Sequence, residues 1–211
     1  MAHDVEPAAS LLERLPDDAS LVRRVGFARL YATAQPVSVV ELAALCGMSQ
    51  TSVEAATDVL TGSGTATLGA GGTLVATGGL SVVPTQHRLR LASREFFTWC
   101  GFDAVGIPAA LAVYGLVRSP CGFCGALVQV TVAAGQPPIQ GSVVGWLPAG
   151  PCEDMQADFC AAASLFCDAQ HLTAWRAAAG DPHGRPATLS DLATEGRQVW
   201  AELRPGATPR L

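Results

Sequence analysis

The sequence predicts an α+β protein in which a winged-helix-like N-terminal part precedes a second part made of strands with flanking helices. Three observations predict it. Apolar residues recur with helical spacing up to about residue 60. Glycines then separate short alternating runs, and farther on strand-like and helix-like segments follow one another. We therefore expect a lead-in at residues 1–20, a winged-helix-like domain at 21–85 and an α+β domain at 86–211.

Two helices are expected before the winged-helix pattern itself. Residues 6–20 carry Leu11, Leu12 and Leu15 at roughly helical spacing, which favours a short helix that packs onto the residues after it. Residues 21–33 have the spacing of an amphipathic helix. Both segments are expected to have a structural role.

Residues 38–60 have the form of a helix-turn-helix. Ser38 and Ser49 each suit an N-cap, and Gly47 separates the two helices. The second helix, at 49–60, contains no arginine that could contact a base. We therefore expect this part to serve as a packing module rather than as a DNA reader.

The composition is that of a globular chain of 211 residues, in which 49% are hydrophobic, 15% are charged and the formal net charge is −5. This acidic balance argues against a large phosphate-binding surface, so we expect no nucleic-acid partner. Apolar runs stay shorter than the ~18 residues of a membrane span, and the N-terminus lacks the basic-then-apolar pattern of a signal peptide. We expect a cytoplasmic protein with no membrane partner.

Cysteine is the residue type that points to chemistry. The chain has seven, an odd number, at Cys46, Cys100, Cys121, Cys124, Cys152, Cys160 and Cys167. In a reducing compartment such a set favours thiols that serve metal or redox chemistry over a disulfide framework. Cys46 lies in an apolar helical stripe and is most simply a core residue.

The stretch from Ser93 to Pro108 combines a predicted helix with a thiol and a carboxyl group. Ser93 suits the N-cap and Glu95 suits the first turn. The apolar spacing places Cys100 on the inward face, with Asp103 beside it one turn later. Burying an ionised carboxylate without partners is costly, so such an aspartate is usually paired, protonated or functional. Cys100 alone is equally consistent with a core residue.

Cys121 and Cys124 form a Cys-x-x-Cys pair before an alternating segment at 126–132 that predicts a strand. Such a knuckle suits a metal, but the sequence shows no second Cys-x-x-Cys or His pair, so a tetrahedral zinc site is not expected. A redox dithiol stays open, although no helix start follows Cys121 to lower its pKa. The roles of Cys152 and Cys167 also stay open.

The remaining segments outline the C-terminal part. They predict a strand at 141–147, a helix at 172–177, a loop at 180–186 and a closing helix at 189–203 that opens at Ser190. Phe159, Cys160 and the small residues after them fit either a buried strand or the inner end of a helix. His171 is a better candidate for a role than His183, because cysteines lie near it in the sequence.

Three runs of residues resemble one family. They are Phe97-Thr98-Trp99-Cys100-Gly101-Phe102-Asp103, Val117-Arg118-Ser119-Pro120-Cys121, and Asp158-Phe159-Cys160 with Trp175 downstream. In this order, over most of the chain, the sequence resembles the organomercurial (alkylmercury) lyases. The resemblance implies a fold in which the winged-helix-like part packs on a mixed β-sheet part with flanking helices and does not read DNA.

The resemblance also implies roles for individual residues. Cys100 and Cys160 match the two catalytic thiols that bind the mercury of the substrate, and Asp103 matches the catalytic acid beside that metal. Cys121 matches a cysteine regarded as structural. The chain departs from the family pattern at Cys124, which is extra, and at residues 161–163, where alanines replace a Cys- and His-rich continuation. Both departures concern substrate range more than the core chemistry.

The activity implied is protonolytic cleavage of the carbon–mercury bond of alkyl or aryl mercurials, giving a hydrocarbon and Hg(II). Soft thiolates suit mercury, and a carboxyl group suits proton delivery. No resident cofactor is expected, and small thiols or a mercuric reductase would accept the product. Two alternatives stay open. One is a non-enzymatic copper- or mercury-binding protein or metal-responsive regulator, and the other is a lyase-fold relative diverted to another thiol-based reaction.

Overall fold

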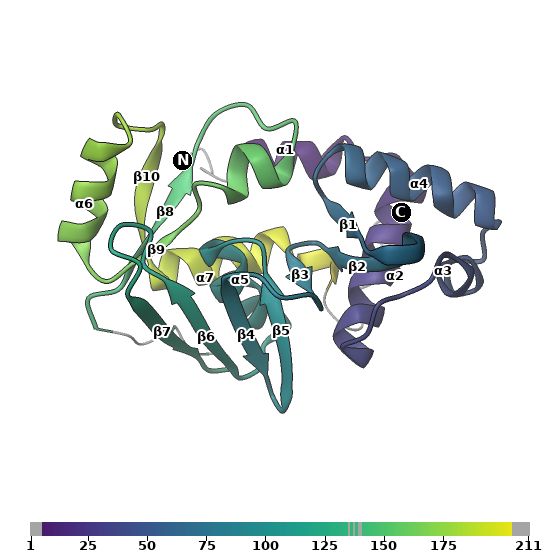
Figure 1. The fold of residues 1–211 in the computed structure, drawn as a ribbon, viewed down its shortest axis with the longest axis horizontal. Helices are drawn as coiled ribbons and strands as arrows, with labels where there is room; N and C mark the ends of the chain where they lie inside the picture. Colours follow the sequence, from purple (N-terminus) through teal and green to yellow (C-terminus); the bar gives the residue numbers. More distant parts are fainter. Residues whose placement is uncertain (1–5, 135, 137, 139–140, 204–211) are drawn as a thin grey trace.

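The structure, a computed structural model, describes residues 6–134, 136, 138 and 141–203. Its larger sheet has the strand order β1-β2-β3-β5-β4-β6-β7, and each neighbouring pair is antiparallel. The strands are β1 (Ala66–Leu68), β2 (Leu74–Thr77), β3 (Leu80–Ser81), β4 (His87–Leu91), β5 (Arg94–Thr98), β6 (Gly115–Pro120) and β7 (Leu127–Val132), as Figure 1 shows.

A smaller sheet lies beside the larger one. Its antiparallel strands have the order β10-β8-β9 and span Gly184–Thr188, Val144–Pro148 and Leu165–Phe166. The backbone N–H of Gly122 donates to the carbonyl of Leu165 at 2.9 Å, and an isolated parallel bridge joins Cys121 to the same residue. These contacts connect the β6–β7 loop of the larger sheet to β9.

From residue 6 onward, the described N-terminal part contains the helices α1 (Glu6–Glu13), α2 (Asp17–Thr33), α3 (Val39–Cys46) and α4 (Gln50–Gly62). The Ser38 hydroxyl accepts the N–H of Glu41, and the Ser49 hydroxyl accepts the N–H of Ser52. Gly47 ends α3 with a φ of 66°, a value that suits glycine. Both predicted caps and the break of the helix-turn-helix are therefore confirmed.

The glycine-rich strands β1 and β2, which follow α4, are part of the larger sheet rather than a separate wing. Strands β1 and β2 pair with each other and continue, through β3, into the same sheet as β5 and β4. The division between residues 21–85 and 86–211 stays a prediction. The α+β class is confirmed by one large antiparallel sheet with helices at its sides.

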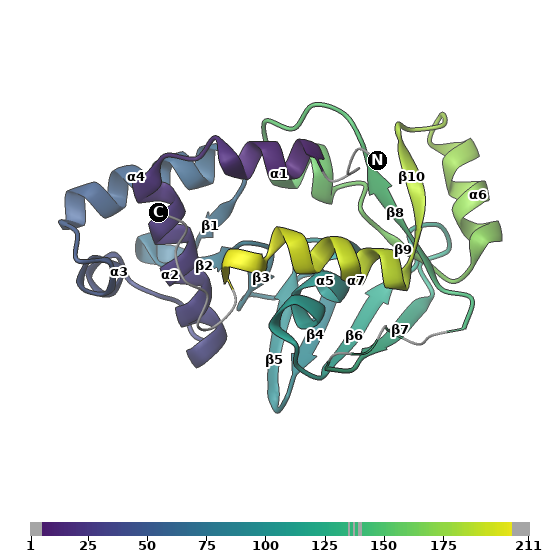
Figure 2. The ribbon, with the colours of Figure 1, turned by 180° about the vertical axis from the view of Figure 1, so that it is seen from behind.

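Helix α5 (Gly101–Leu111) forms the centre of the core. All its residues are buried, and it packs between the larger sheet and α7 (Leu189–Val199), as Figure 2 shows. A Cβ added to Gly196 would lie 2.3 Å from the Cα of Gly106, so the two helices cross backbone to backbone. This close crossing depends on the absence of side chains at both positions.

The helix predicted from Ser93 is wrong over its first part. Ser93 lies in the turn after β4, and residues 94–98 form β5, which pairs with β4 on one side and β3 on the other. Short apolar runs fit either period, and the aromatic and β-branched side chains of this run suit a strand. Long-range backbone pairing therefore decides the conformation, and the helix begins only at Gly101.

The C-terminal predictions hold in part. The helix at 172–177 is confirmed as α6 (Ala169–Ala178). The closing helix is confirmed as α7, but it begins at Leu189 with Thr188 as its cap, and the predicted loop at 180–186 already contains the start of β10. The sequence left the conformation at Cys160 open between a strand and a helix, and in the structure Cys160 ends a π-helix that starts at Met155. In the described part of the chain, no helix is long and apolar enough to span a membrane.

Candidate active site

Cys100 is the N-cap of α5. Its sulfur accepts the backbone N–H of Asp103 at 3.4 Å, and the Thr98 hydroxyl donates to its carbonyl at 3.0 Å. The start of a helix favours negative charge, because its first N–H groups and its dipole point toward that end. The strand-to-helix junction thus gives this sulfur an N–H donor that offsets part of the cost of burying a thiolate, with Asp103 one turn later as the sequence predicts.

Cys160 reaches this junction from a distant part of the chain. It ends the π-helix, and the segment just after it is held to α5 by a hydrogen bond of 2.8 Å from the Gly101 N–H to the Ala163 carbonyl. A Cβ on Gly101 would lie 2.9 Å from the backbone nitrogen of Leu165. Glycine at this position therefore lets the two backbones approach closely enough to bring Cys160 beside Cys100.

The three residues predicted for the site come together. The sulfur of Cys160 lies 4.0 Å from Oδ2 of Asp103, and the three potential ligand atoms all lie within 4.8 Å of one another. The exposed fractions of Cys100, Asp103 and Cys160 are 0%, 4% and 7%. Two thiols and a carboxyl group at these distances are able to bind one soft metal ion away from bulk water.

Burial changes the proton affinity of all three groups. It raises the pKa of Asp103 to about 7, although hydrogen bonds from the Cys100 thiol and from the backbone N–H groups of Cys100 and Trp99 act in the opposite direction. Burial also raises the pKa of Cys100. The pKa of Cys160 is raised well above its usual value, first by its hydrogen bond with Cys100 and then by burial. Near neutral pH the site therefore holds protons on its thiols and on part of its carboxyl population.

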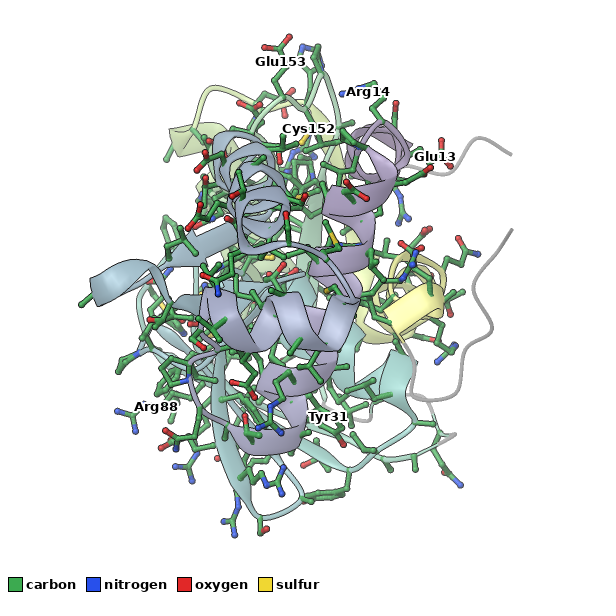
Figure 3. The ribbon with its side chains drawn as sticks, turned by 90° about the vertical axis from the view of Figure 1, so that its right-hand side faces the viewer. Glu13, Arg14, Tyr31, Arg88, Cys152 and Glu153 are labelled. Carbon is green, nitrogen blue, oxygen red and sulfur yellow. The ribbon has the colours of Figure 1, made fainter. Side chains whose placement is uncertain are left out.

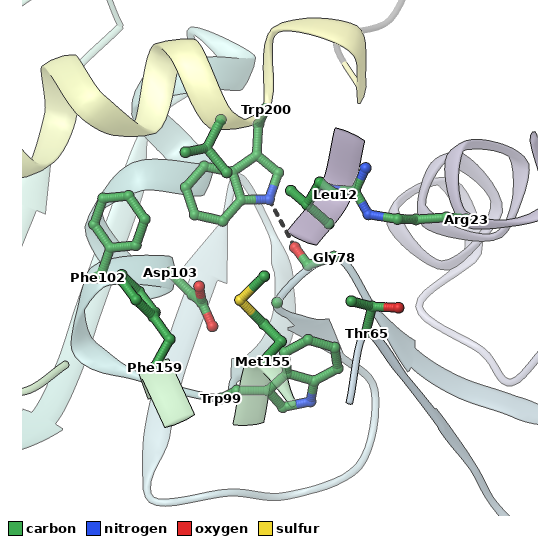
Figure 4. A pocket seen from close by; sticks show the side chains of 12 residues that line it. Leu12, Arg23, Thr65, Gly78, Trp99, Phe102, Asp103, Met155, Phe159 and Trp200 are labelled. Atoms are coloured by element: carbon green, nitrogen blue, oxygen red, sulfur yellow. Dashed lines mark hydrogen bonds between the residues drawn. The ribbon is translucent and has the colours of Figure 1, made fainter. Parts of the chain in front are cut away.

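An apolar cavity with about 370 Å³ of empty space, open mouth included, reaches this carboxyl group. Figure 4 shows Asp103 directed into it, and Phe102 and Met155 line the same space. Aromatic rings make up much of the remaining wall, from Trp99, Phe159 and Trp200. Within the described residues, the lining includes Asp103 but neither Cys100 nor Cys160. The carboxyl group therefore faces the cavity, and the sulfurs lie behind it.

Glycine and tryptophan hold the carboxyl group in place. A Cβ on Gly79, which has a φ of 83°, would lie 2.7 Å from Cγ of Asp103, so the carboxyl group packs directly on the backbone there. The adjacent Gly78 carbonyl accepts the indole N–H of Trp200 at 2.7 Å (Figure 4). This turn of the larger sheet fixes one wall of the site.

Helix α1 contributes to the site, although the sequence suggests only a packing role for it. Leu12 lines the cavity. The Arg14 guanidinium donates to the carbonyl of Cys152 at 3.1 Å, and Figure 3 shows these two residues side by side. Sequence reasoning missed Leu12 because nothing in its spacing distinguishes a cavity wall from ordinary packing.

A second cluster of potential ligands lies in the β6–β7 loop and at the start of α6. Cys121, Cys124, Cys167 and His171 have ligand atoms that all lie within 4.8 Å of one another. The sequence contains no second Cys-x-x-Cys or His pair, but the fold brings one cysteine and one histidine to Cys121 and Cys124, so the four side chains could hold a metal ion. The missed signal is the spacing of Cys167 and His171, which lie four residues apart at a helix start.

The buried pair of thiols with an adjacent carboxyl group belongs to the class of sites that select soft metal ions. Residues 80–201, more than half of the chain, match the family model described as alkylmercury lyase. The chain belongs to the alkylmercury lyase family, and the resemblance seen in the sequence is confirmed.

Three curated relatives share parts of this sequence. The alkylmercury lyase of Staphylococcus epidermidis is 35% identical over 54 residues, which cover 26% of this chain and 25% of that protein. The enzyme of Streptomyces lividans is 36% identical over 58 residues, covering 28% and 27%. That of Pseudomonas putida is 27% identical over 100 residues, covering 46% and 47%. The matches thus span between a quarter and about half of the relatives' lengths.

A solved structure matches nearly the whole fold. The crystal structure of the mercury-bound form of MerB2 aligns with a TM-score of 0.84 over 95% of this chain and 98% of that chain, at 23% sequence identity. This likeness extends the shared fold beyond the segment matched by the family model, to the N-terminal helices.

Proposed function

We propose that this protein is an organomercurial lyase that cleaves the carbon–mercury bond of alkyl or aryl mercurials by protonolysis. The observation that carries the proposal is the buried cluster of Cys100, Asp103 and Cys160, with ligand atoms within 4.8 Å of one another beside an apolar cavity. Membership in the alkylmercury lyase family supports the same chemistry.

In the first step, the two thiols bind the mercury of the substrate. Thiolate is the form that binds a metal, so each sulfur must release a proton. Cys100 has the advantage of the helix N-terminus, where its sulfur already accepts an N–H. Asp103 is positioned to accept a proton, because its carboxyl oxygen lies 4.0 Å from the sulfur of Cys160.

In the second step, the proton on Asp103 is delivered to the carbon attached to mercury. Two thiolate ligands raise the electron density at the metal and hence the carbanion character of the leaving carbon. Of the two protons released by the thiols, one forms the new C–H bond and the other leaves with the displaced counterion. The products are a hydrocarbon and Hg(II) held by Cys100 and Cys160. Mercury keeps its oxidation state, so the balance calls for no redox cofactor.

The cavity is suited to the organic group of the substrate. Aromatic and thioether side chains offer apolar contact, and Asp103 is directed into the same space. Hg(II) bound to two buried thiolates is held tightly, so its release calls for competing thiols. We propose that small cellular thiols or a mercuric reductase accept it, which would place the reaction in the cytoplasm.

The test incubates the 211-residue chain with phenylmercuric acetate and excess small thiol, and measures benzene by gas chromatography. The Asp103→Asn variant is expected to bind the mercurial and to release little benzene, since ligation survives while the proton donor is lost. Cys46→Ser, in α3 and outside the cluster, serves as the control and is expected to retain activity.

Two results would count against the proposal. Benzene release by Asp103→Asn at the wild-type rate would remove the acid from the mechanism. Tight mercurial binding by the unmodified chain with no benzene formed would instead indicate a mercury-binding protein.

A further inference from the structure

The cluster of Cys121, Cys124, Cys167 and His171, here called the Cys3His cluster, is separate from the candidate active site. Its ligands come from two elements. Cys121 and Cys124 lie in the loop between β6 and β7, and Cys167 and His171 flank the start of α6. Four side chains of these types, from two distant segments, form the usual ligand set of a structural zinc site.

The distances agree with tetrahedral zinc. With Zn–S bonds of about 2.3 Å and a Zn–N bond of about 2.0–2.1 Å, tetrahedral geometry puts two sulfurs about 3.8 Å apart and a sulfur and a nitrogen about 3.6 Å apart. The sulfurs of Cys124 and Cys167 are 3.9 Å apart, and the sulfur of Cys121 lies 3.6 Å from Nδ1 of His171. A disulfide between Cys124 and Cys167 would need their sulfurs about 2.05 Å apart.

The backbone of the loop is shaped as a metal knuckle. The Gly125 N–H donates to the Cys121 carbonyl at 2.9 Å, and Gly125 has a φ of 70°, which suits glycine. The Cys121 N–H donates to the carbonyl of Ala126 at 2.8 Å. These two backbone hydrogen bonds fix the conformation of the loop that carries Cys121 and Cys124.

His171 is oriented for the same purpose. The Asp168 side chain caps α6 by accepting the His171 backbone N–H at 2.9 Å, which fixes the first turn. The ring of His171 lies against that of Phe123, with centroids 5.5 Å apart. The cap thus fixes the backbone of His171, the Phe123 ring lies against the imidazole, and Nδ1 lies 3.6 Å from the Cys121 sulfur.

We propose that Cys121, Cys124, Cys167 and His171 together bind one Zn²⁺ ion that joins the β6–β7 loop to the start of α6. As the three Zn–S bonds form, the three cysteines release their protons to solvent, while His171 binds through a neutral ring nitrogen. Four protein ligands complete the tetrahedron and leave no position for substrate, which distinguishes this site from the active-site cluster with its adjacent cavity.

The ion would stabilise the segment that carries Cys160. The Cys121 loop already pairs with Leu165 of β9, and Gly101 of α5 is hydrogen bonded to Ala163 in the same segment. Cys167 ends this run only seven residues after Cys160. A metal that fixes Cys121 relative to Cys167 therefore also restrains the path of the chain from Cys160 onward.

The test measures metal rather than activity, so it does not depend on the proposed function. The 211-residue chain is reconstituted with excess Zn²⁺ under reducing conditions, desalted, and analysed for zinc by mass spectrometry. We expect one zinc per chain in the wild type, in Cys46→Ser and in Cys100→Ser. We expect its loss in Cys124→Ser and in Cys167→Ser. Cys124 is exposed, so its replacement leaves the core intact.

Cobalt gives an independent readout of the ligands. Co²⁺ bound in place of Zn²⁺ is expected to show the intense visible absorption of a tetrahedral ion, together with sulfur-to-metal charge transfer at shorter wavelength. His171→Ala is expected to shift the visible bands. A chelator should lower the melting temperature of the wild type and leave that of Cys124→Ser unchanged. Absence of zinc from the reconstituted wild type would overturn the proposal. So would zinc that persists in Cys124→Ser and Cys167→Ser but is lost in Cys100→Ser.

Discussion

Replacement of Asp103 by asparagine should increase the stability of the folded protein above neutral pH. The pKa of this carboxyl group is raised from 3.8 to about 7 by burial. The unfolded chain therefore loses its Asp103 proton at lower pH than the folded chain does, and folding must bind a proton or bury a charge. Asp103 therefore lowers the free energy of unfolding once pH exceeds its pKa in the unfolded chain. This loss grows as pH rises and levels off above the pKa of Asp103 in the folded chain.

The magnitude follows from the difference between the two pKa values. About three pKa units at ~1.36 kcal/mol each give a penalty of about 4 kcal/mol above pH 7. Near pH 5.5 the penalty is about 2 kcal/mol, because only the interval above the unfolded pKa has then been crossed. Asparagine keeps the shape and carries no charge, so the stability difference in favour of Asp103→Asn should increase by about 2 kcal/mol between pH 5.5 and 7.5 and then level off.

Urea denaturation followed by tryptophan fluorescence across this pH range measures the difference. Asp191→Asn is a control of opposite sign, because the capping box with Thr188 lowers the pKa of Asp191, so its removal should destabilise α7 at neutral pH. Equal stability of wild type and Asp103→Asn at pH 8, or a difference independent of pH, would refute the raised pKa and with it the proton-donor role.

Three further predictions concern the walls of the site and one helix cap. Gly79→Ala places a Cβ 2.7 Å from Cγ of Asp103, so it should lower both the free energy of unfolding and the rate of benzene release. Gly180→Ala is the control with smaller expected losses, because Gly180 has a similar positive φ of 77° but no atom within 4 Å of the added Cβ. Trp200→Phe removes the N–H that donates to the Gly78 carbonyl and should lower the free energy of unfolding by about 1–3 kcal/mol in urea titrations, whereas an unchanged value would show that water replaces the bond. Ser49→Ala should lower the free energy of unfolding by about 1 kcal/mol, because the cap of α4 is lost. Ser190→Ala, which replaces a serine inside α7 and removes no cap, is the matched control.

Local signals in the sequence were sufficient where a residue acts within its own turn. The ends of two helices lie at Ser38, Gly47 and Ser49 as predicted, because a cap depends on hydrogen bonds to residues three or four positions away. The helix predicted from Ser93 failed because β5 satisfies its backbone groups with β3 and β4, partners that no local pattern identifies. The division at residue 85 stays a prediction, because β3 before it pairs with β5 after it in one sheet.

Residue identity and spacing along a single element were enough to predict the α+β class, the family and the one-turn relation between Cys100 and Asp103. Tertiary packing places Cys160 beside these two residues, raises the pKa of Asp103 by burial, and brings Cys167 and His171 close to Cys121 and Cys124. The physical reason is that distances between atoms far apart in the chain, and the exclusion of water around them, arise from packing of the whole core.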